Sequence, residues 1–175
     1  MNNPVFIINN FTKKLLKGIP KINPQTQYLE IYSPNNQLIE IIPFSKLNHG
    51  LWGFVYERLV GLYYEDLGYE VDYIGLEKNF KDLGIDLICK KNSDCLCIQC
   101  KCVHKNIGKQ SLENILYKAS RFFEKNKFDV KPTFLIVVPN IKKTFTLKLQ
   151  NYVKSLNYTQ NYTYLKIEEL NLLNI

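Results

Sequence analysis

The sequence predicts a mixed α/β fold, in which one central sheet is flanked by helices on both faces. Apolar residues recur at helical spacing in three segments, and strand-length runs of apolar residues lie between them. From residue 48 onward the expected order is helix, three strands, helix, strand, helix, strand. With 175 residues, of which 46% are hydrophobic, the chain is long enough for one domain with a full core.

Residues 1–47 are expected to form an N-terminal extension that carries a β-hairpin. Two strand-like segments, 27–32 and 37–42, are joined by Ser-Pro-Asn-Asn at residues 33–36, which is a turn signal. Three roles stay open for this extension: dimerisation, substrate binding, or covering the core.

Residues 48–175 are expected to form the main domain, which begins with a helix. Asn48 is its expected N-cap, apolar residues follow at helical spacing, and Gly68 ends it. Three strands follow, at residues 69–74, 85–89 and 95–103, separated by a basic loop over 77–83 and a turn over 90–94.

The remaining elements alternate between helix and strand. Residues 109–125 have an amphipathic helical pattern, and residues 133–138 form a continuous apolar run, as expected of a strand buried on both faces. A helix over 145–156 and a strand over 162–167 complete the expected sheet.

Positive charge is concentrated in the middle of the chain. Residues 77–148 carry 15 Lys or Arg against 7 Asp or Glu, whereas residues 1–76 carry 6 against 7 and residues 149–175 carry 2 against 2. Such clustering is what a polyanion-binding site needs. The apolar runs are too short to span a bilayer and the N-terminus does not resemble a secretory signal, so we expect an intracellular protein.

Four of the five cysteines lie within residues 95–102. Thiols at two-residue spacing along a strand have poor geometry for a disulfide, so we expect reduced, buried thiols. The alternative is a structural zinc site formed with His104, although a straight strand sends successive thiols to opposite faces.

Asp86, Gln99 and Lys101 are the most informative polar residues. Asp86 opens the second expected strand, and Gln99 and Lys101 leave the same face of the third because they are two residues apart. A carboxylate, an amide oxygen and an ammonium group can together hold a hard metal ion and activate a bound water. Phosphodiester cleavage needs this combination, with a cation to orient the water or to stabilise the developing charge.

The segments Gly-Ile-Asp-Leu-Ile (84–88) and Ile-Gln-Cys-Lys (98–101) resemble the PD-(D/E)XK nuclease superfamily, and in particular its Mrr-like restriction endonuclease branch. The similarity covers roughly residues 48–140. It implies a restriction-endonuclease-like αβββαβ core, which agrees with the order read above. Two departures are visible, because Ile85 precedes the aspartate in place of proline and Gln99 replaces an acid.

The resemblance also implies roles for the site residues. Asp86 would be the central metal ligand, Glu57 on the first helix a direct or water-mediated second ligand, and Gln99 a ligand through its carbonyl oxygen. Lys101 would position or deprotonate the attacking water, or stabilise the transition state. The implied cofactor is Mg²⁺, with Mn²⁺ as a substitute, and Gln99 should weaken metal binding because it removes a negative charge.

The resemblance further implies DNA as the partner, in the cytoplasm or in an organelle that holds DNA. One such site cuts one strand, so double-strand cleavage would require a homodimer or a higher homo-oligomer. Further residues are expected to contact DNA phosphates, because they lie on loops and a helix next to the site: Lys78, Lys81, Lys105, Lys109, Gln110, Lys118 and Arg121.

The sequence therefore predicts a metal-dependent DNA endonuclease of the restriction, homing or resolvase type, or one that acts in repair. Three alternatives remain: a catalytically inactive DNA-binding module with the same fold, an RNA-directed nuclease, and a zinc-stabilised structural protein.

Overall fold

The computed structural model describes residues 4–78, 84–103, 105–156 and 164–173. They contain a three-stranded antiparallel sheet, in the order β1-β2-β3, and a five-stranded mixed sheet, in the order β4-β5-β6-β7-β8. The elements are α1 (Pro4–Lys17), β1 (Ile19–Ile22), β2 (Leu29–Tyr32), β3 (Leu38–Ile42), α2 (His49–Asp66), β4 (Glu70–Asp72), α3 (Ile74–Lys78), β5 (Leu87–Lys91), β6 (Asp94–Cys100), α4 (Lys109–Lys125), β7 (Thr133–Val138), α5 (Ile141–Thr144), α6 (Leu147–Ser155) and β8 (Leu165–Glu169), with a 3-10 turn at Phe44–Lys46.

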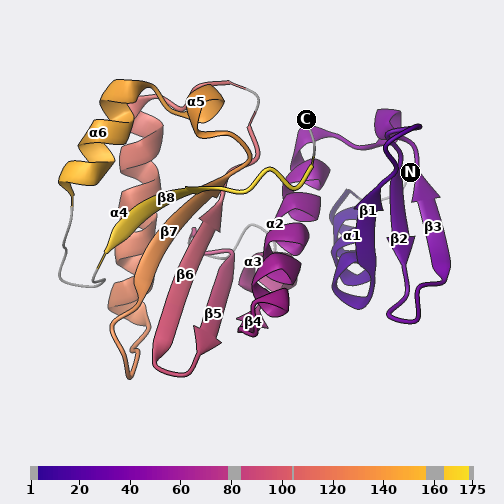
Figure 1. The fold of residues 1–175 in the computed structure, drawn as a ribbon, viewed down its shortest axis with the longest axis horizontal. Helices are drawn as coiled ribbons and strands as arrows, with labels where there is room; N and C mark the ends of the chain where they lie inside the picture. Colours follow the sequence, from indigo (N-terminus) through magenta and orange to yellow (C-terminus); the bar gives the residue numbers. More distant parts are fainter. Residues whose placement is uncertain (1–3, 79–83, 104, 157–163, 174–175) are drawn as a thin grey trace.

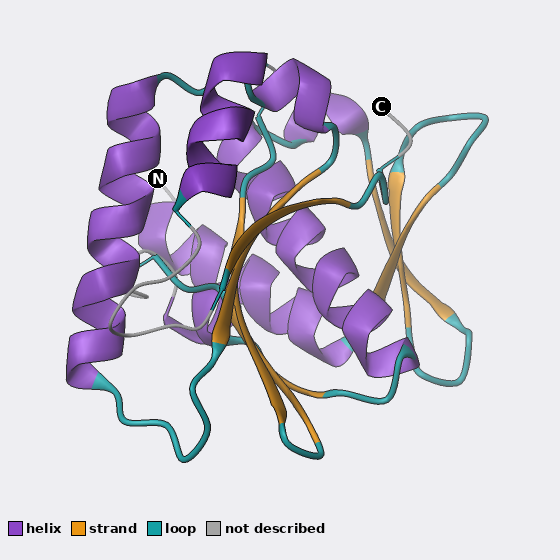
Figure 2. Ribbon diagram, turned by 60° about the vertical axis from the view of Figure 1, so that its left-hand side comes forward, coloured by secondary structure: helices purple, strands orange, loops and turns teal. Residues whose placement is uncertain are grey.

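The five-stranded sheet has helices on both faces, as predicted. β4, β5 and β6 are antiparallel neighbours, whereas β6, β7 and β8 run parallel. Figure 1 shows α2 between the two sheets and α4 on the opposite side of the large sheet, and Figure 2 shows the helical layers around it. The order α2-β4-β5-β6-α4-β7 is the αβββαβ core expected from the sequence, which confirms the predicted fold class.

β7 shows why the sheet is buried on both faces. Leu135 and Val137 pack into the core beneath α2, whereas Phe134, Ile136 and Val138 pack into the core beneath α4. A central strand that alternates between two cores is apolar at every position. The unbroken apolar run in the sequence therefore predicted this strand correctly.

The two long helices begin and end where the sequence predicted. Asn48 caps α2, since its Oδ1 accepts from the backbone N–H of Leu51 at 2.9 Å. Gly68 follows the end of that helix with φ of +87°, a conformation that favours glycine. α4 buries an apolar stripe along one face: Leu112, Ile115, Ala119, Phe122 and Phe123.

The N-terminal extension is larger than the predicted hairpin. β2 and β3 form that hairpin, but α1 and β1 accompany it, and neither was expected. Leu15 of α1 and Leu29 of β2 are fully buried in the same core as α2. The extension therefore shares a hydrophobic core with the main domain.

Arg58 of α2 attaches α1 to the rest of the molecule. Its guanidinium donates to the backbone carbonyls of Leu15, at 2.8 Å, and Gly18, at 3.2 Å. It also lies 3.5 Å from the Glu65 carboxylate and stacks on the Tyr73 ring at 4.7 Å. These contacts satisfy the C-terminal carbonyls of α1, which have no partner within that helix.

Several predicted boundaries were wrong. The strand over 69–74 ends at Asp72, because Ile74 and Leu76 turn into the core as part of α3, which also takes up the first residues of the expected loop. β5 extends to Lys91, which shortens the expected turn. β6 ends at Cys100, three residues early, and β8 covers residues 165–169. The helix expected over 145–156 is α6, at residues 147–155, and the short helix α5 before it was not expected; Phe145 is extended between the two.

None of the helices in the described ranges has the length and apolar character that crossing a membrane would require.

Candidate active site

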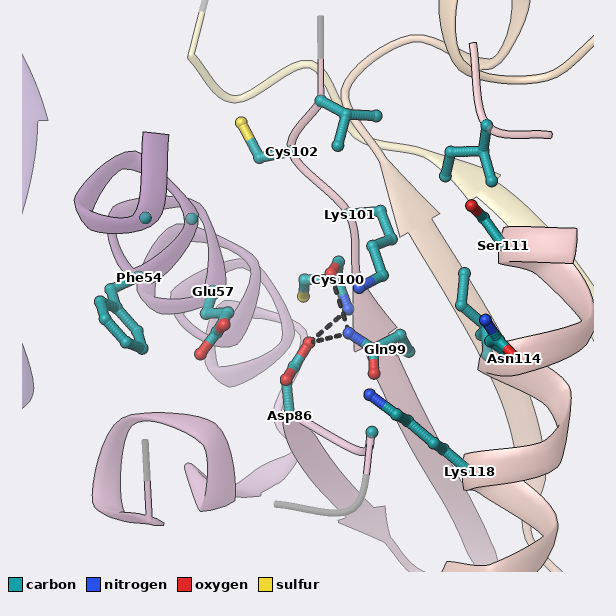
Figure 3. A pocket seen from close by; sticks show the side chains of 16 residues that line it. Phe54, Glu57, Asp86, Gln99, Cys100, Lys101, Cys102, Ser111, Asn114 and Lys118 are labelled. Carbon is teal, nitrogen blue, oxygen red and sulfur yellow. Dashed lines mark hydrogen bonds between the residues drawn. The ribbon is translucent and has the colours of Figure 1, made fainter. Parts of the chain in front are cut away.

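A cavity of about 600 Å³ opens beside the ends of β5 and β6, between α2 and α4. Figure 3 shows the side chains that line it. All four predicted catalytic residues lie on its wall, although they come from three separate stretches of the chain: Glu57, Asp86, Gln99 and Lys101.

Asp86 lies deep in the cavity, with only 2% of its surface exposed. Its Oδ2 accepts two hydrogen bonds, from the Cys100 backbone N–H at 2.7 Å and from Gln99 Nε2 at 2.8 Å. Its own backbone N–H donates to Ile98 at 2.8 Å, which continues the pairing of β5 with β6. The carboxylate is therefore held in one orientation, with Oδ2 directed at β6.

Glu57 approaches Asp86 from α2. A Cβ added to Gly75 would lie 2.5 Å from Glu57 Oε2 and 3.2 Å from Asp86 Oδ1. Both carboxylate oxygens therefore lie close to Gly75, and a side chain at residue 75 would displace Glu57. Gly75 belongs to α3, and its backbone N–H donates to the Asp86 carbonyl at 2.9 Å.

This donor set fits a hard divalent cation. Mg²⁺ usually takes one or two protein carboxylates and completes its octahedral shell with waters and phosphate oxygens. Within residues 4–78, 84–103, 105–156 and 164–173, no group of three or more His, Cys, Asp or Glu side chains is arranged to hold a metal ion. Two neighbouring carboxylates on the wall of one cavity match the magnesium preference better than that of zinc, which takes nitrogen and sulfur ligands.

Gln99 presents its nitrogen, rather than its oxygen, to Asp86. Nε2 donates both to Asp86 Oδ2 and to the Cys100 carbonyl, at 3.0 Å. Because both partners are acceptors, the reverse orientation of the amide would place oxygen against oxygen. The Gln99 carbonyl oxygen lies instead 3.4 Å from the Cβ position of Gly84. Gln99 thus orients Asp86, and its role as a metal ligand stays a prediction.

Lys101 follows the end of β6. Its backbone N–H donates to Val137 at 2.9 Å, and its side chain lines the cavity beside Gln99 (Figure 3). Cys100 lies between Gln99 and Lys101 in the sequence. Burial raises the pKa of its thiol well above the ordinary value, and the nearby Asp86 and Glu57 carboxylates raise it further. Cys100 therefore stays a neutral thiol.

The predicted DNA-contact residues fall into different places. Lys118 lines the cavity, whereas Lys109 and Arg121 lie outside its lining and approach Glu113 at 3.7 Å and Glu124 at 3.8 Å. The other described members are exposed side chains near the site or on α4: Lys78, Lys105 and Gln110. Lys81 lies outside the described residues, as does His104.

Sequence reasoning missed several residues of the cavity. Gly50 and Gly53 line it from α2, and Asn114 lines it from α4. The signal for Asn114 was present, since Ser111, Asn114 and Lys118 follow the spacing of one helix face.

The cysteines are free thiols. Cys89, Cys95, Cys97 and Cys100 are buried, and Cys102 is half-buried. Cys100 packs on the α2 side of the sheet and Cys97 on the α4 side, as expected for a straight strand. Both observations confirm the prediction of small, reduced thiols that fill the core.

The αβββαβ order, with a carboxylate, an amide and a lysine at the ends of two central strands, defines a restriction-endonuclease-like fold. Residues 50–127 match the family Mrr_cat, described as restriction endonuclease. This match includes all four predicted catalytic residues and confirms the resemblance inferred from the sequence.

One solved structure, a repair endonuclease from Pyrococcus abyssi, is similar with a TM-score of 0.44 and 10% sequence identity. The similarity covers 87% of this chain, which spans 66% of the length of that one. No curated protein matches the sequence.

Proposed function

We propose that the protein is a Mg²⁺-dependent endonuclease that hydrolyses phosphodiester bonds in DNA. The observation that carries this proposal is the convergence of Glu57 Oε2 and Asp86 Oδ1 beside Gly75, in a cavity that Lys101 also lines. Two carboxylates and an ammonium group that line one cavity are the groups that metal-assisted hydrolysis requires.

Each residue then has a defined task. Asp86 and Glu57 would hold the metal ion, which when bound acts as a Lewis acid and makes a coordinated water more acidic. Gln99 and the Cys100 backbone N–H fix the orientation of Asp86. Lys101 directs the attacking water and stabilises the negative charge that grows on the phosphate.

The charge distribution supports DNA as the substrate. The excess of Lys and Arg falls within residues 77–148, the stretch that supplies Asp86, Lys101 and Lys118 to the cavity. Phosphate contacts of this kind bind any sequence, so the restriction, homing, resolvase and repair settings share the same site chemistry. One site cuts one strand, and a homo-oligomer would supply the second site for double-strand cleavage.

Cleavage of supercoiled plasmid and of a branched duplex tests the proposal. Wild type should nick or cut with Mg²⁺ or Mn²⁺ and lose this activity in EDTA, and Asp86→Ala and Lys101→Ala should be inactive under all conditions. Cleavage that persists in Asp86→Ala would contradict the proposed site.

A second candidate is a DNA-binding module that does not cleave. The hydrogen bond from Gln99 Nε2 to Asp86 Oδ2 favours it, because the amide fills a place where an acid would add a metal ligand. This candidate predicts DNA binding by wild type without metal-dependent cleavage, and a Lys101→Ala effect no larger than the loss of one charge.

A further inference from the structure

A second lysine reaches the cavity from the wall opposite Lys101. Lys118 belongs to α4, and it lines the cavity together with Ser111 and Asn114 of the same helix face. Figure 3 shows its side chain extending from α4 toward Gln99 and Asp86. Arg121, one turn further along α4, is not part of the cavity lining and lies beside Glu124.

The stem of Lys118 packs against Gly84. A Cβ on Gly84 would lie 3.5 Å from Lys118 Cδ, an ordinary contact, and 3.0 Å from Lys118 Cβ, which would have to shift by a few tenths of an ångström. Gly84 also has φ of +81°, which favours glycine. The segment that leads into Asp86 therefore supports the lysine stem and directs its ammonium group into the cavity.

The charge around Lys118 leaves it available for an anion. In the described ranges, neither Lys101 nor Lys118 takes part in a salt bridge. Its neighbour Gln99 is neutral, and Gln99 Oε1 lies 3.4 Å from the same Gly84 Cβ position. An acid at residue 99 would place a carboxylate there and pair with the ammonium group, whereas the amide adds no negative charge beside it.

We propose that Lys118 is a second catalytic lysine, whose ammonium group binds a non-bridging oxygen of the scissile phosphate from the α4 side while Lys101 acts from the β6 side. The inference rests on the proposed nuclease function. In that reaction a water oxygen bonds to phosphorus, the bond from phosphorus to one sugar oxygen breaks, and the displaced proton of the water ends on the leaving hydroxyl. The phosphate gains negative charge on the way, so two flanking cations stabilise the transition state more than the ground state.

The test compares Lys118→Met with Lys125→Met, at the end of α4. Methionine keeps most of the stem that packs on Gly84 and removes the charge, and the control removes a charge from the same helix outside the cavity.

DNA affinity is measured by fluorescence anisotropy in EDTA, and the cleavage rate is measured in Mg²⁺ with saturating enzyme. Lys118→Met should lower that rate about 100-fold, as expected for the loss of one transition-state donor. Both variants should weaken binding to a similar, small extent.

Sulfur substitution at the scissile phosphate adds a readout that misfolding would not reproduce. Sulfur accepts hydrogen bonds poorly, so replacing the non-bridging oxygen that contacts Lys118 should slow wild type more than Lys118→Met. Thermal melting of both variants checks that the fold is retained.

The outcomes separate the two claims. If wild type cleaves and Lys118→Met cleaves equally fast at saturation, or shows the same sulfur effect as wild type, the inference fails and the proposed function stands. If wild type does not cleave at all, the proposed function fails and Lys118 has no catalytic role.

Discussion

Gln99 shapes the site through the hydrogen bond that its amide donates to Asp86, at 2.8 Å. A glutamate at this position would place two carboxylates in direct contact at a site where both side chains are almost fully buried. Without a metal ion, like charges this close raise the pKa of the pair, so that one carboxylate retains a proton. The amide avoids this repulsion, because its nitrogen donates a hydrogen bond to Asp86.

Gln99→Glu should destabilise the metal-free protein by about 2–4 kcal/mol, because it replaces a buried hydrogen bond with repulsion. Since the pKa of the carboxylate pair is raised in the folded state, stability should fall as the pH rises from 5 to 8. Mg²⁺ should restore it by screening both charges. Thermal melts at both pH values, with EDTA or Mg²⁺, measure this. Gln110→Glu, on the exposed surface of α4, is the control. An equal loss of stability by Gln99→Glu at both pH values would refute the explanation.

Individual side chains were predictable where strand periodicity fixed their direction. The spacing of Gln99 and Lys101 placed both on the cavity wall, and Asp86 followed from its place before an apolar run. The orientation of the Gln99 amide was not predictable, because it depends on two acceptors that only the folded chain brings together. Gly75 was missed for the same reason, since its role arises from the tertiary approach of α3 to α2.

At the scale of elements, α2 presents an unusually bare face to the cavity. Gly50 and Gly53 lie two turns and one turn, respectively, before Glu57 on this face, and a Cβ added to Gly53 would meet no atom within 4 Å. A nucleic acid backbone can therefore approach the carboxylates over Gly50 and Gly53, where α2 carries no side chains.

Gly53→Ala should raise the stability by about 0.5–1 kcal/mol, since alanine is the better helix former. Gly53→Leu is also a good helix former, but it extends into the space that the substrate would occupy. We expect it to keep the wild-type melting temperature or exceed it and to lose at least about tenfold in cleavage rate, a loss of about 1.4 kcal/mol in transition-state stabilisation. Rapid cleavage by Gly53→Leu would show that the substrate does not pass along α2.

The contact between α1 and α2 depends on Arg58. Arg58→Met should destabilise the protein by about 2–4 kcal/mol, because it leaves the buried carbonyls of Leu15 and Gly18 without a donor. Urea denaturation measures the loss, and Arg121→Met is the control for removing an exposed arginine. A loss below about 1 kcal/mol would mean that apolar packing alone holds the extension.

Elements were predictable in proportion to their length and periodicity. α2, α4 and β7 each repeat one pattern over several turns or residues, so their positions agree with the prediction within one or two residues. α3 has only five residues and β1 only four, which is too short for a periodic signal. The two-helix break at Phe145 depends on the burial of that ring, with 1% exposed, rather than on a helix-breaking residue.

At the scale of the molecule, net charge divides the chain into a nearly neutral first part and a basic middle part. DNA affinity should therefore weaken as salt increases, with a slope of at least about −3 in a plot of log K against log salt concentration, if four or more phosphates are neutralised. Anisotropy titrations between about 50 and 200 mM salt in EDTA measure the slope. A flat response would argue against DNA as the ligand of the basic region.

The fold class was predictable because the order of helices and strands allows few arrangements of one mixed sheet. The size of the N-terminal extension was not predictable, since its first helix gains its stability from α2 and from Arg58 rather than from its own sequence. The cavity walls likewise depend on how α2 and α4 face each other across the sheet.

The central claim is that Glu57 and Asp86 together hold one divalent ion that cleavage requires. Calorimetric titration of Mn²⁺ into wild type, Glu57→Gln and Asp86→Asn, run beside plasmid cleavage by the same samples, tests it directly. We expect one ion per chain for wild type, a loss of at least about tenfold in affinity for each variant, and a parallel loss of cleavage, since each removes one of two carboxylate ligands. Unchanged metal affinity in both variants, or cleavage by both at the wild-type rate, would contradict the account.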